Sequence, residues 1–258
     1  MPFDIVAFLE TQTATTLSPV AGVADSQYKV SGDDIYVKKE ASFLAGLLHV
    51  GVSTPKRAEM RQPSLRIPYR FNKSVLATVV DHRAGFTNLL TRPMPLYAGE
   101  KLNAYVQNAT AEYSVLVAWL SSGYIQPKAG VNPTHTLTAD IDSTLTVNIW
   151  NEISPTYDQD LPKGKYAVLG MKVGSYVATC NPLVSRLKCP NTEFRPGVIT
   201  TEITADKTMF VNAKDDVETA WGQMAGIEFP HDNPPKIEML SLTADTDHIL
   251  ELLCRKIG

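Results

Sequence analysis

Apolar and polar residues alternate with a period of two through much of this chain of 258 residues, and this alternation is the feature that most limits its fold. The clearest case is the segment 64–71, which sets Leu65, Ile67, Tyr69 and Phe71 against Arg66, Pro68 and Arg70. Successive side chains of a β-strand point to opposite faces of the sheet, so this pattern predicts a strand with one buried face.

Other segments repeat the pattern. Residues 136–150 alternate with a slip in phase at Ser143, which predicts a bulge or turn there. Residues 113–120 are apolar on both faces, as expected of a central strand. Further strands are predicted at 74–80, 101–107, 112–120, 166–179, 183–188, 198–204, 236–242 and 249–253, and short helices at 3–9, 41–49 and 216–224. Many short strands separated by Pro-rich turns predict an all-β sandwich or barrel with few short helices.

The length suits two domains of about 130 residues each. The segment 123–133 contains two Pro and two Gly and has no sustained apolar pattern, so it is the best candidate for a linker. Similar phrases, Leu-Tyr-Ala-Gly at 96–99 and Leu-Pro-Lys-Gly at 161–164, open a predicted strand in each half. We therefore predict an N-terminal arm at 1–20 and two β-domains at 21–127 and 128–258.

Charge is unevenly distributed along the chain. The net charge of −3 argues against a protein whose main task is to coat nucleic acid, but residues 1–130 carry 13 Lys and Arg against 10 Asp and Glu. One cluster, here called the basic stripe, is opposed only by Glu59 and consists of Lys56, Arg57, Arg61, Arg66, Arg70 and Lys73. It could bind acidic surfaces, lipid headgroups or nucleic acid, or serve as a solvated face or a set of intersubunit salt bridges. Few aromatic residues alternate with these cations, which disfavours a dedicated nucleic-acid groove.

The N-terminal segment has its own pattern. Phe3, Val6 and Leu9 are at helical spacing and are followed by the polar stretch 11–16. This pattern predicts an apolar tip on an arm that docks on a neighbouring subunit or on a membrane. The alternative is that the three residues pack within their own domain.

Chemistry-bearing motifs are few. The chain has no Gly-x-Ser-x-Gly, His-Glu-x-x-His, P-loop or Gly-x-Gly-x-x-Gly motif, and its five histidines are scattered. Cys180, Cys189 and Cys254 are odd in number, form no Cys-x-x-Cys motif and are expected to be reduced. Cys180, Cys189 and His231 fit no zinc spacing, and the Asp pairs 140/142 and 158/160 lack the pattern of an EF-hand. We expect no catalytic residue, metal or cofactor, and no enzyme activity.

The start of the chain does not have the pattern of a secretory signal. The longest apolar stretch, 43–52, is far short of the roughly 20 residues of a membrane span. We therefore expect synthesis in the cytoplasm and a soluble product.

Three phrases together resemble a known family: Leu-Tyr-Ala-Gly-Glu-Lys-Leu-Asn-Ala-Tyr-Val-Gln-Asn at 96–108, Leu-Pro-Lys-Gly-Lys-Tyr-Ala-Val-Leu-Gly-Met at 161–171 and Phe-Arg-Pro-Gly at 194–197. The size, the twofold organisation and these turn phrases are similar to the double jelly-roll major capsid proteins of internally membraned icosahedral phages. The resemblance covers residues from about 60 to 255. A length of 258 residues leaves little room for the long loops that build towers in larger relatives.

The resemblance implies two jelly-roll sandwiches in tandem, each of eight strands. It implies homotrimers that act as pseudo-hexameric capsomers and tile an icosahedral shell, in a virion protein made in the host cytoplasm. The implied partners are other copies of the chain, penton or minor capsid proteins, and viral lipid headgroups or the genome through the basic stripe. No catalytic residue is carried over from the family.

Two other functions are compatible with the sequence. One is a carbohydrate- or receptor-binding β-sandwich of a phage spike, fibre or lectin, in which exposed Trp119, Trp150, Trp221 or tyrosine residues would stack on sugars. The other is a hydrolase that uses Cys180 or a serine with a distant histidine. Trp119 and Trp150 lie within strand patterns, which favours packing in a core over a sugar platform.

Overall fold

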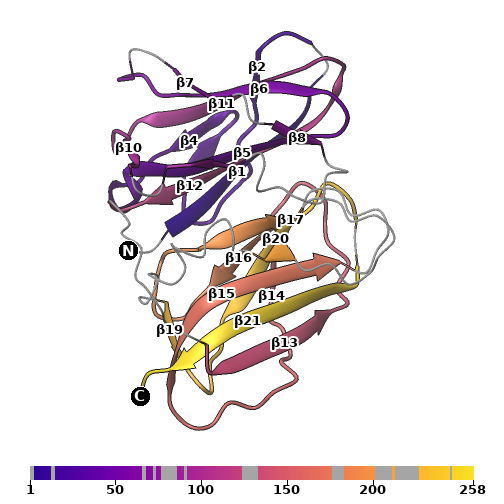
Figure 1. Cartoon of the computed structure of the whole chain (residues 1–258). Helices are drawn as coiled ribbons and strands as arrows, with labels where there is room; N and C mark the ends of the chain where they lie inside the picture. Colours follow the sequence, from indigo (N-terminus) through magenta and orange to yellow (C-terminus); the bar gives the residue numbers. More distant parts are fainter. Residues whose placement is uncertain are drawn as a thin grey trace. The chain divides into compact units, whose positions relative to one another are not determined.

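The computed structural model describes residues 3–12, 15–65, 68–71, 74–76, 86–89, 92–123, 133–175, 183–200, 211–212, 227–244 and 246–258 (Figure 1). These residues form an all-β protein made of several antiparallel sheets, as the alternation predicts. The chain divides into an N-terminal unit, Ile5–Tyr124, and a C-terminal unit, which consists of Met1–Asp4 and Ile125–Gly258. Most of the predicted linker, residues 124–132, lies outside the described residues.

Two sheets make up the N-terminal unit. The first joins, in this order, β1 (Phe3–Gln12), β12 (Glu112–Ser121), β5 (Phe43–Gly51) and β10 (Met94–Pro95), and β5 also pairs with β8 (Ser74–Leu76) and β9 (Thr87–Asn88). The second joins β3 (Val30–Ser31), β4 (Asp34–Tyr36), β11 (Lys101–Asn108), β6 (Pro55–Arg61) and β7 (Tyr69–Phe71), and β11 also pairs with β2 (Ser18–Val20). One short 3-10 helix, η1 (Lys39–Ala41), precedes β5.

Two further sheets make up the C-terminal unit. The first joins β13 (His135–Ile141), β21 (His248–Lys256), β15 (Lys165–Ser175) and β18 (Val211–Asn212), and β15 also pairs with β19 (Glu228–Pro230). The second joins β14 (Asn151–Ile153), β20 (Lys236–Leu240), β16 (Leu183–Lys188) and β17 (Gly197–Thr200).

The two units share one strand order. Eight strands of the N-terminal unit in chain order are β1, β4, β5, β6, β7, β10, β11 and β12, and eight of the C-terminal unit are β13, β14, β15, β16, β17, β18, β20 and β21. In each unit one sheet joins the first, eighth, third and sixth of these strands, and the other joins the second, seventh, fourth and fifth. The first strand therefore pairs with the eighth, the second with the seventh, the third with the sixth and the fourth with the fifth. This is the pairing of one long hairpin rolled up into two sheets.

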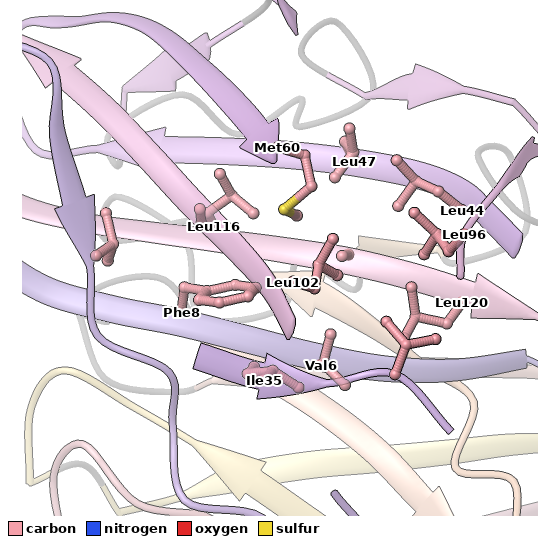
Figure 2. Close-up of a cluster of buried hydrophobic side chains, with 14 of the residues drawn as sticks. Val6, Phe8, Ile35, Leu44, Leu47, Met60, Leu96, Leu102, Leu116 and Leu120 are labelled. Carbon is pink, nitrogen blue, oxygen red and sulfur yellow. The ribbon is translucent and has the colours of Figure 1, made fainter. Parts of the chain in front are cut away.

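Both sheets of the N-terminal unit contribute to one core (Figure 2). Val6, Leu47 and Leu116 come from the first sheet, and Met60 and Leu102 come from the second; all are at most 1% exposed. Two sheets that each bury one face against the other form a sandwich, and removal of this apolar area from water is the main term that stabilises it.

Strand β12 confirms the prediction of a central strand, because it lies between β1 and β5. Its residues from Ser114 to Ser121 are all buried. Leu116 points into the core, whereas Trp119 points to the opposite face and packs edge-on against Phe86 at a distance of 5.0 Å between ring centroids. Strands β11, β16, β20 and β21 likewise confirm the predictions at 101–107, 183–188, 236–242 and 249–253.

The predicted helices at 3–9 and 41–49 are wrong. The first segment is part of β1, and the second forms most of β5. Both strands are apolar at most positions, and a continuous apolar run fits a strand buried on both faces as well as it fits a helix. The third predicted helix, at 216–224, lies outside the described residues.

The N-terminal segment is built into the fold rather than projecting as an arm. Phe3, Val6 and Leu9 are 0%, 1% and 8% exposed, and all three belong to β1. β2, which also lies within the predicted arm, pairs with β11. The structure therefore favours the alternative that these residues pack within the chain, because an apolar tip for docking would have to be exposed.

Two predicted strands are shorter than the alternation suggests. In 64–71 the strand begins only at Tyr69, and Arg66 and Ile67 lie outside the described residues. In 136–150 the strand ends at Ile141, and Asn151 holds a loop in place of the second half. The Asn151 side chain accepts a hydrogen bond from the Thr146 N–H at 2.8 Å and donates to the Ile149 carbonyl at 3.0 Å. These bonds satisfy backbone groups that a strand would otherwise pair.

The two similar turn phrases do precede strands, but the strands are not equivalent. Gly99 has a φ of +81°, which favours glycine, and leads into β11, the seventh strand of its unit. Gly164 leads into β15, the third strand of its unit, and a Cβ there would lie 2.6 Å from Cε of Lys256. The phrases therefore mark tight turns, and the similarity of the two units lies in their strand order.

The outer edge of β13 is closed by a loop of its own unit. At Thr138, the N–H donates to Oε1 of Gln159 at 2.7 Å, and the carbonyl accepts from the Asp158 N–H at 2.8 Å. Gln159 Nε2 also donates to the Thr138 hydroxyl at 2.7 Å. Side chains and backbone of this loop thus occupy the groups with which another strand would pair.

Replacement of Leu116 by Ala should lower the free energy of unfolding of the N-terminal unit by about 2–5 kcal/mol, because it leaves a cavity between the two sheets. The matched control is Tyr113→Ala on the same strand, where the side chain is 41% exposed and the loss should be below about 1 kcal/mol. Urea denaturation of the two variants measures the difference. Equal losses would show that the core is not where β12 places it.

Candidate interaction surface

Three members of the basic stripe, Arg57, Arg61 and Arg70, lie on the outer side of the second sheet of the N-terminal unit. Arg57 and Arg61 on β6 alternate with Ala58 and Met60, whose side chains belong to the core. The two arginines therefore point away from the core. Lys56 lies where the register between β6 and β11 shifts, and it is exposed at the start of the strand.

Two members of the stripe, Arg66 and Lys73, lie outside the described residues. Arg70 lies on β7, directly opposite Glu59 of β6 in the antiparallel register. On its other side Glu59 is opposite Tyr105 of β11. The carboxylate therefore lies in the middle of a row of three strands.

Glu59 organises the surrounding cations. Its side chain is fully buried, and its two carboxylate oxygens lie 2.9 Å from Nη2 of Arg61 and 2.9 Å from Nε of Arg70. The arginines themselves remain 37% and 61% exposed. The guanidinium of Arg61 also lies over the ring of Tyr105, with its central carbon 3.7 Å from the ring centroid. This ring is covered and does not offer a platform for stacking a base or a sugar.

A positive surplus remains on this face. Arg57, Arg61 and Arg70 together carry three positive charges against one on Glu59. Nε of Arg57 is buried and has no hydrogen-bond partner within the described ranges. Glu59 has the same phase as Arg57 and Arg61 on β6, so its position between the two arginines can be predicted from the alternation alone.

The corresponding face of the C-terminal unit carries a similar but buried cluster. Glu238 on β20 lies opposite Arg186 on β16, and Nε of Arg186 is 2.6 Å from the carboxylate. Arg195 donates a second charged hydrogen bond of 2.6 Å from Nη1. The Arg186 guanidinium lies 3.9 Å from the ring centroid of Trp150. All three charged side chains are buried, so this cluster is a structural network.

An exposed ion pair borders the buried cluster. Glu152 on β14 is opposite Glu238, and its carboxylate accepts hydrogen bonds from Lys188 at 2.5 Å and from Lys236 at 3.1 Å. These two ammonium groups hold the pKa of Glu152 below its usual value. The partners of Glu238 and of Glu152 are at least 36 residues away from them in the sequence, so no local pattern could have indicated these contacts.

His49 is the histidine most like a catalytic base. Its Nδ1 lies 2.8 Å from the Ser74 hydroxyl and its Nε2 3.3 Å from the Ser114 hydroxyl, which also accepts from Nδ2 of Asn108 at 2.8 Å. The side chain is fully buried, and this burial lowers the pKa of His49 to about 3. A neutral imidazole without access to water fits a structural network within the first sheet better than it fits an acid–base catalyst.

The remaining candidates offer little chemistry. Cys189 and Cys254 are free and buried, and burial raises the pKa of both thiols, that of Cys254 to about 12. Cys180, His82 and Trp221 lie outside the described residues. Within the part of the chain that the structure describes, no group of three or more His, Cys, Asp and Glu could hold a metal ion, and no helix could span a bilayer.

Comparison with known proteins found no matching family model, no matching curated protein and no matching solved structure.

The unfolding free energy of the N-terminal unit should fall by about 2 kcal/mol between pH 7 and pH 5 through His49 alone. Its pKa of about 3 in the folded chain is far below the ordinary value of 6.5, so only the unfolded state takes up a proton in this range. The contribution of His49 to the free energy of unfolding is therefore present above pH 6.5 and is lost as the pH falls towards 3.

Urea denaturation of the wild type and of His49→Gln at both pH values isolates this contribution. His231→Gln, at a partly exposed histidine, is the matched control and should keep the wild-type dependence. A dependence that is identical in His49→Gln and in the wild type would contradict the prediction.

Glu238→Gln should destabilise the C-terminal unit by about 3–5 kcal/mol, because it leaves two buried guanidinium groups without their counter-charge. Glu152→Gln, at the paired position on β14, removes only exposed ion pairs and should cost less than about 1 kcal/mol. Denaturation at pH 7 compares the two variants. Similar losses for both would show that burial does not distinguish the two carboxylates.

Proposed function

We propose that this chain is the major capsid protein of an icosahedral virus and that each unit is a jelly roll. The observation that carries the proposal is the strand order shared by the two units. A jelly roll is a double-sheet fold of eight strands, in which a long hairpin of strands is rolled into two facing sheets. The first-with-eighth, second-with-seventh, third-with-sixth and fourth-with-fifth pairing supports this fold in both units.

Two like sandwiches in one chain suit the building of a shell. A head-to-tail contact closes into a ring when its rotation is a whole fraction of a turn. Three chains of two units each present six similar lobes, and a six-lobed ring tiles a surface as a hexagon does. The proposed assembly is accordingly a homotrimer that acts as a pseudo-hexameric capsomer, with penton and minor capsid proteins completing the shell.

The outer face of the N-terminal unit provides a surface for contacts in such a shell. Arg57, Arg61 and Arg70 leave a surplus of positive charge around Glu59. We propose that this face serves assembly, either against other copies or against the lipid headgroups or genome enclosed by the shell. The proposed location is the virion, and the proposed role is structural, without catalysis or cofactor.

A carbohydrate- or receptor-binding module is the second candidate. It would need exposed aromatic rings on which sugars stack. Trp119 is buried against Phe86, and the ring of Trp150 is covered by the Arg186 guanidinium. These contacts count against both tryptophans as sugar platforms, whereas Tyr97 and Tyr113 are 50% and 41% exposed and are the rings that a glycan could reach.

Light scattering after size exclusion, with negative-stain images of the same fractions, tests the proposal on the full chain. The expected mass is three times 28.3 kDa, together with larger closed particles at high concentration. A monomer that does not associate at any concentration and binds a glycan on an array would instead support the binding module.

A further inference from the structure

A hollow of about 400 Å³ lies on the N-terminal unit. It is beside the outer side of the second sheet, where Arg57, Arg61 and Arg70 form what is here called the basic face. Strands β1 and β2 and the turn between β3 and β4 line the hollow, with Glu10, Gln12, Ser18, Pro19, Gly32 and Asp33 among the lining residues. Glu10 is exposed and Asp33 is half-buried. Among the described residues, no Lys, Arg or His lines the hollow, and the charged side chains that do line it, Glu10 and Asp33, are negative.

Gln12 gives the hollow a second feature that calls for a ligand. The residue is 3% exposed, and its Nε2 donates to the carbonyls of Ser18 and Pro19 at 3.4 and 3.1 Å. Its Oε1 is buried and accepts no hydrogen bond from the residues that the structure describes. A buried acceptor without a donor is unfavourable by about 1–3 kcal/mol, and such groups in native proteins usually have a partner. The hollow thus presents two carboxylates and an unused amide oxygen, which together suit a cationic hydrogen-bond donor.

The complementary surface lies on the same sheet, across one strand. β2 and β6 flank β11 on opposite sides, because Val20 and Met60 both pair with Ala104. On the β6 side, Arg57 has a buried Nε without a partner, and Arg70 is 61% exposed. A donor-rich and an acceptor-rich surface therefore lie side by side, separated by the width of β11.

We propose that the hollow binds arginine side chains from the Arg57–Arg70 face of a second copy of this chain. The planar guanidinium donates two parallel hydrogen bonds to a carboxylate, and its remaining N–H groups can reach an amide oxygen. Because the two surfaces are adjacent, a twofold axis between two copies brings each hollow opposite the other copy's arginines. The contact is self-complementary and is used twice, as in an isologous interface.

This inference rests on the proposed shell function and assigns the contact a place in it. A threefold ring uses head-to-tail contacts, whereas the paired surfaces here suit a reciprocal contact. The structure thus assigns this surface to the association of one trimer with the next.

A charge swap on the full chain tests the contact. Asp33→Lys replaces a negative charge of the hollow by a positive one, and Arg57→Glu replaces a positive charge of the basic face by a negative one. Neither side chain makes a hydrogen bond or ion pair that the structure describes, so each variant should fold. The control variants are Asp142→Lys and Lys163→Glu, which reverse exposed charges of the C-terminal unit.

Sedimentation velocity over a range of concentrations measures both trimer formation and further association. We expect each single variant to remain trimeric and to weaken association between trimers by about tenfold or more, and the double variant Asp33→Lys with Arg57→Glu to restore much of it. The control variants should behave as the wild type.

The other outcomes separate the two proposals. Trimers that associate equally well in the wild type and both single variants, or a double variant that shows no restoration, would overturn the contact and leave the shell function standing. A wild type that stays monomeric at every concentration would overturn both.

Discussion

Pairing between strands far apart in the sequence is the constraint on which the rest of this structure depends. In each unit the first strand pairs with the last, β1 with β12 and β13 with β21. The second strand then pairs with the seventh, the third with the sixth and the fourth with the fifth, and each of these pairs closes a shorter loop than the one before. The apolar faces of the two sheets meet only when this order is in place, so the core in Figure 2 is a consequence of the pairing. Folds dominated by such non-local contacts close large loops before burial compensates the lost chain entropy, and they fold slowly.

Local patterns were enough to locate strands but not to pair them. The alternation at 101–107 and 183–188 and the apolar run at 112–120 correspond to β11, β16 and β12. The same kind of evidence failed at 3–9 and 41–49, where apolar residues at helical spacing also fit strands buried on both faces. The similar turn phrases at Gly99 and Gly164 open strands at different positions in their units. Their likeness therefore reflects the needs of a tight turn.

For the charged residues, too, local patterns predict positions on a strand but not the partners on neighbouring strands. The positions of Arg57, Glu59 and Arg61 on one side of β6 could be read from their spacing of two. That Arg70 completes the set depends on the register of β7 against β6, which the sequence does not encode locally. The partnership of Glu238 with Arg186 spans 52 residues and exists only because β16 and β20 are neighbours. In the C-terminal unit the arginines of such a cluster are buried, while in the N-terminal unit Arg61 and Arg70 remain partly exposed at the surface.

The loop that covers Thr138 on the edge of β13 has a consequence for how copies of the chain can associate. An open strand edge can recruit the edge of another molecule through the backbone, and this contact repeats without limit and without regard to side chains. Asp158 and Gln159 remove that option at Thr138 by taking its N–H and carbonyl. At this edge, contacts between molecules are left to side chains, whose geometry can favour closed particles over fibres.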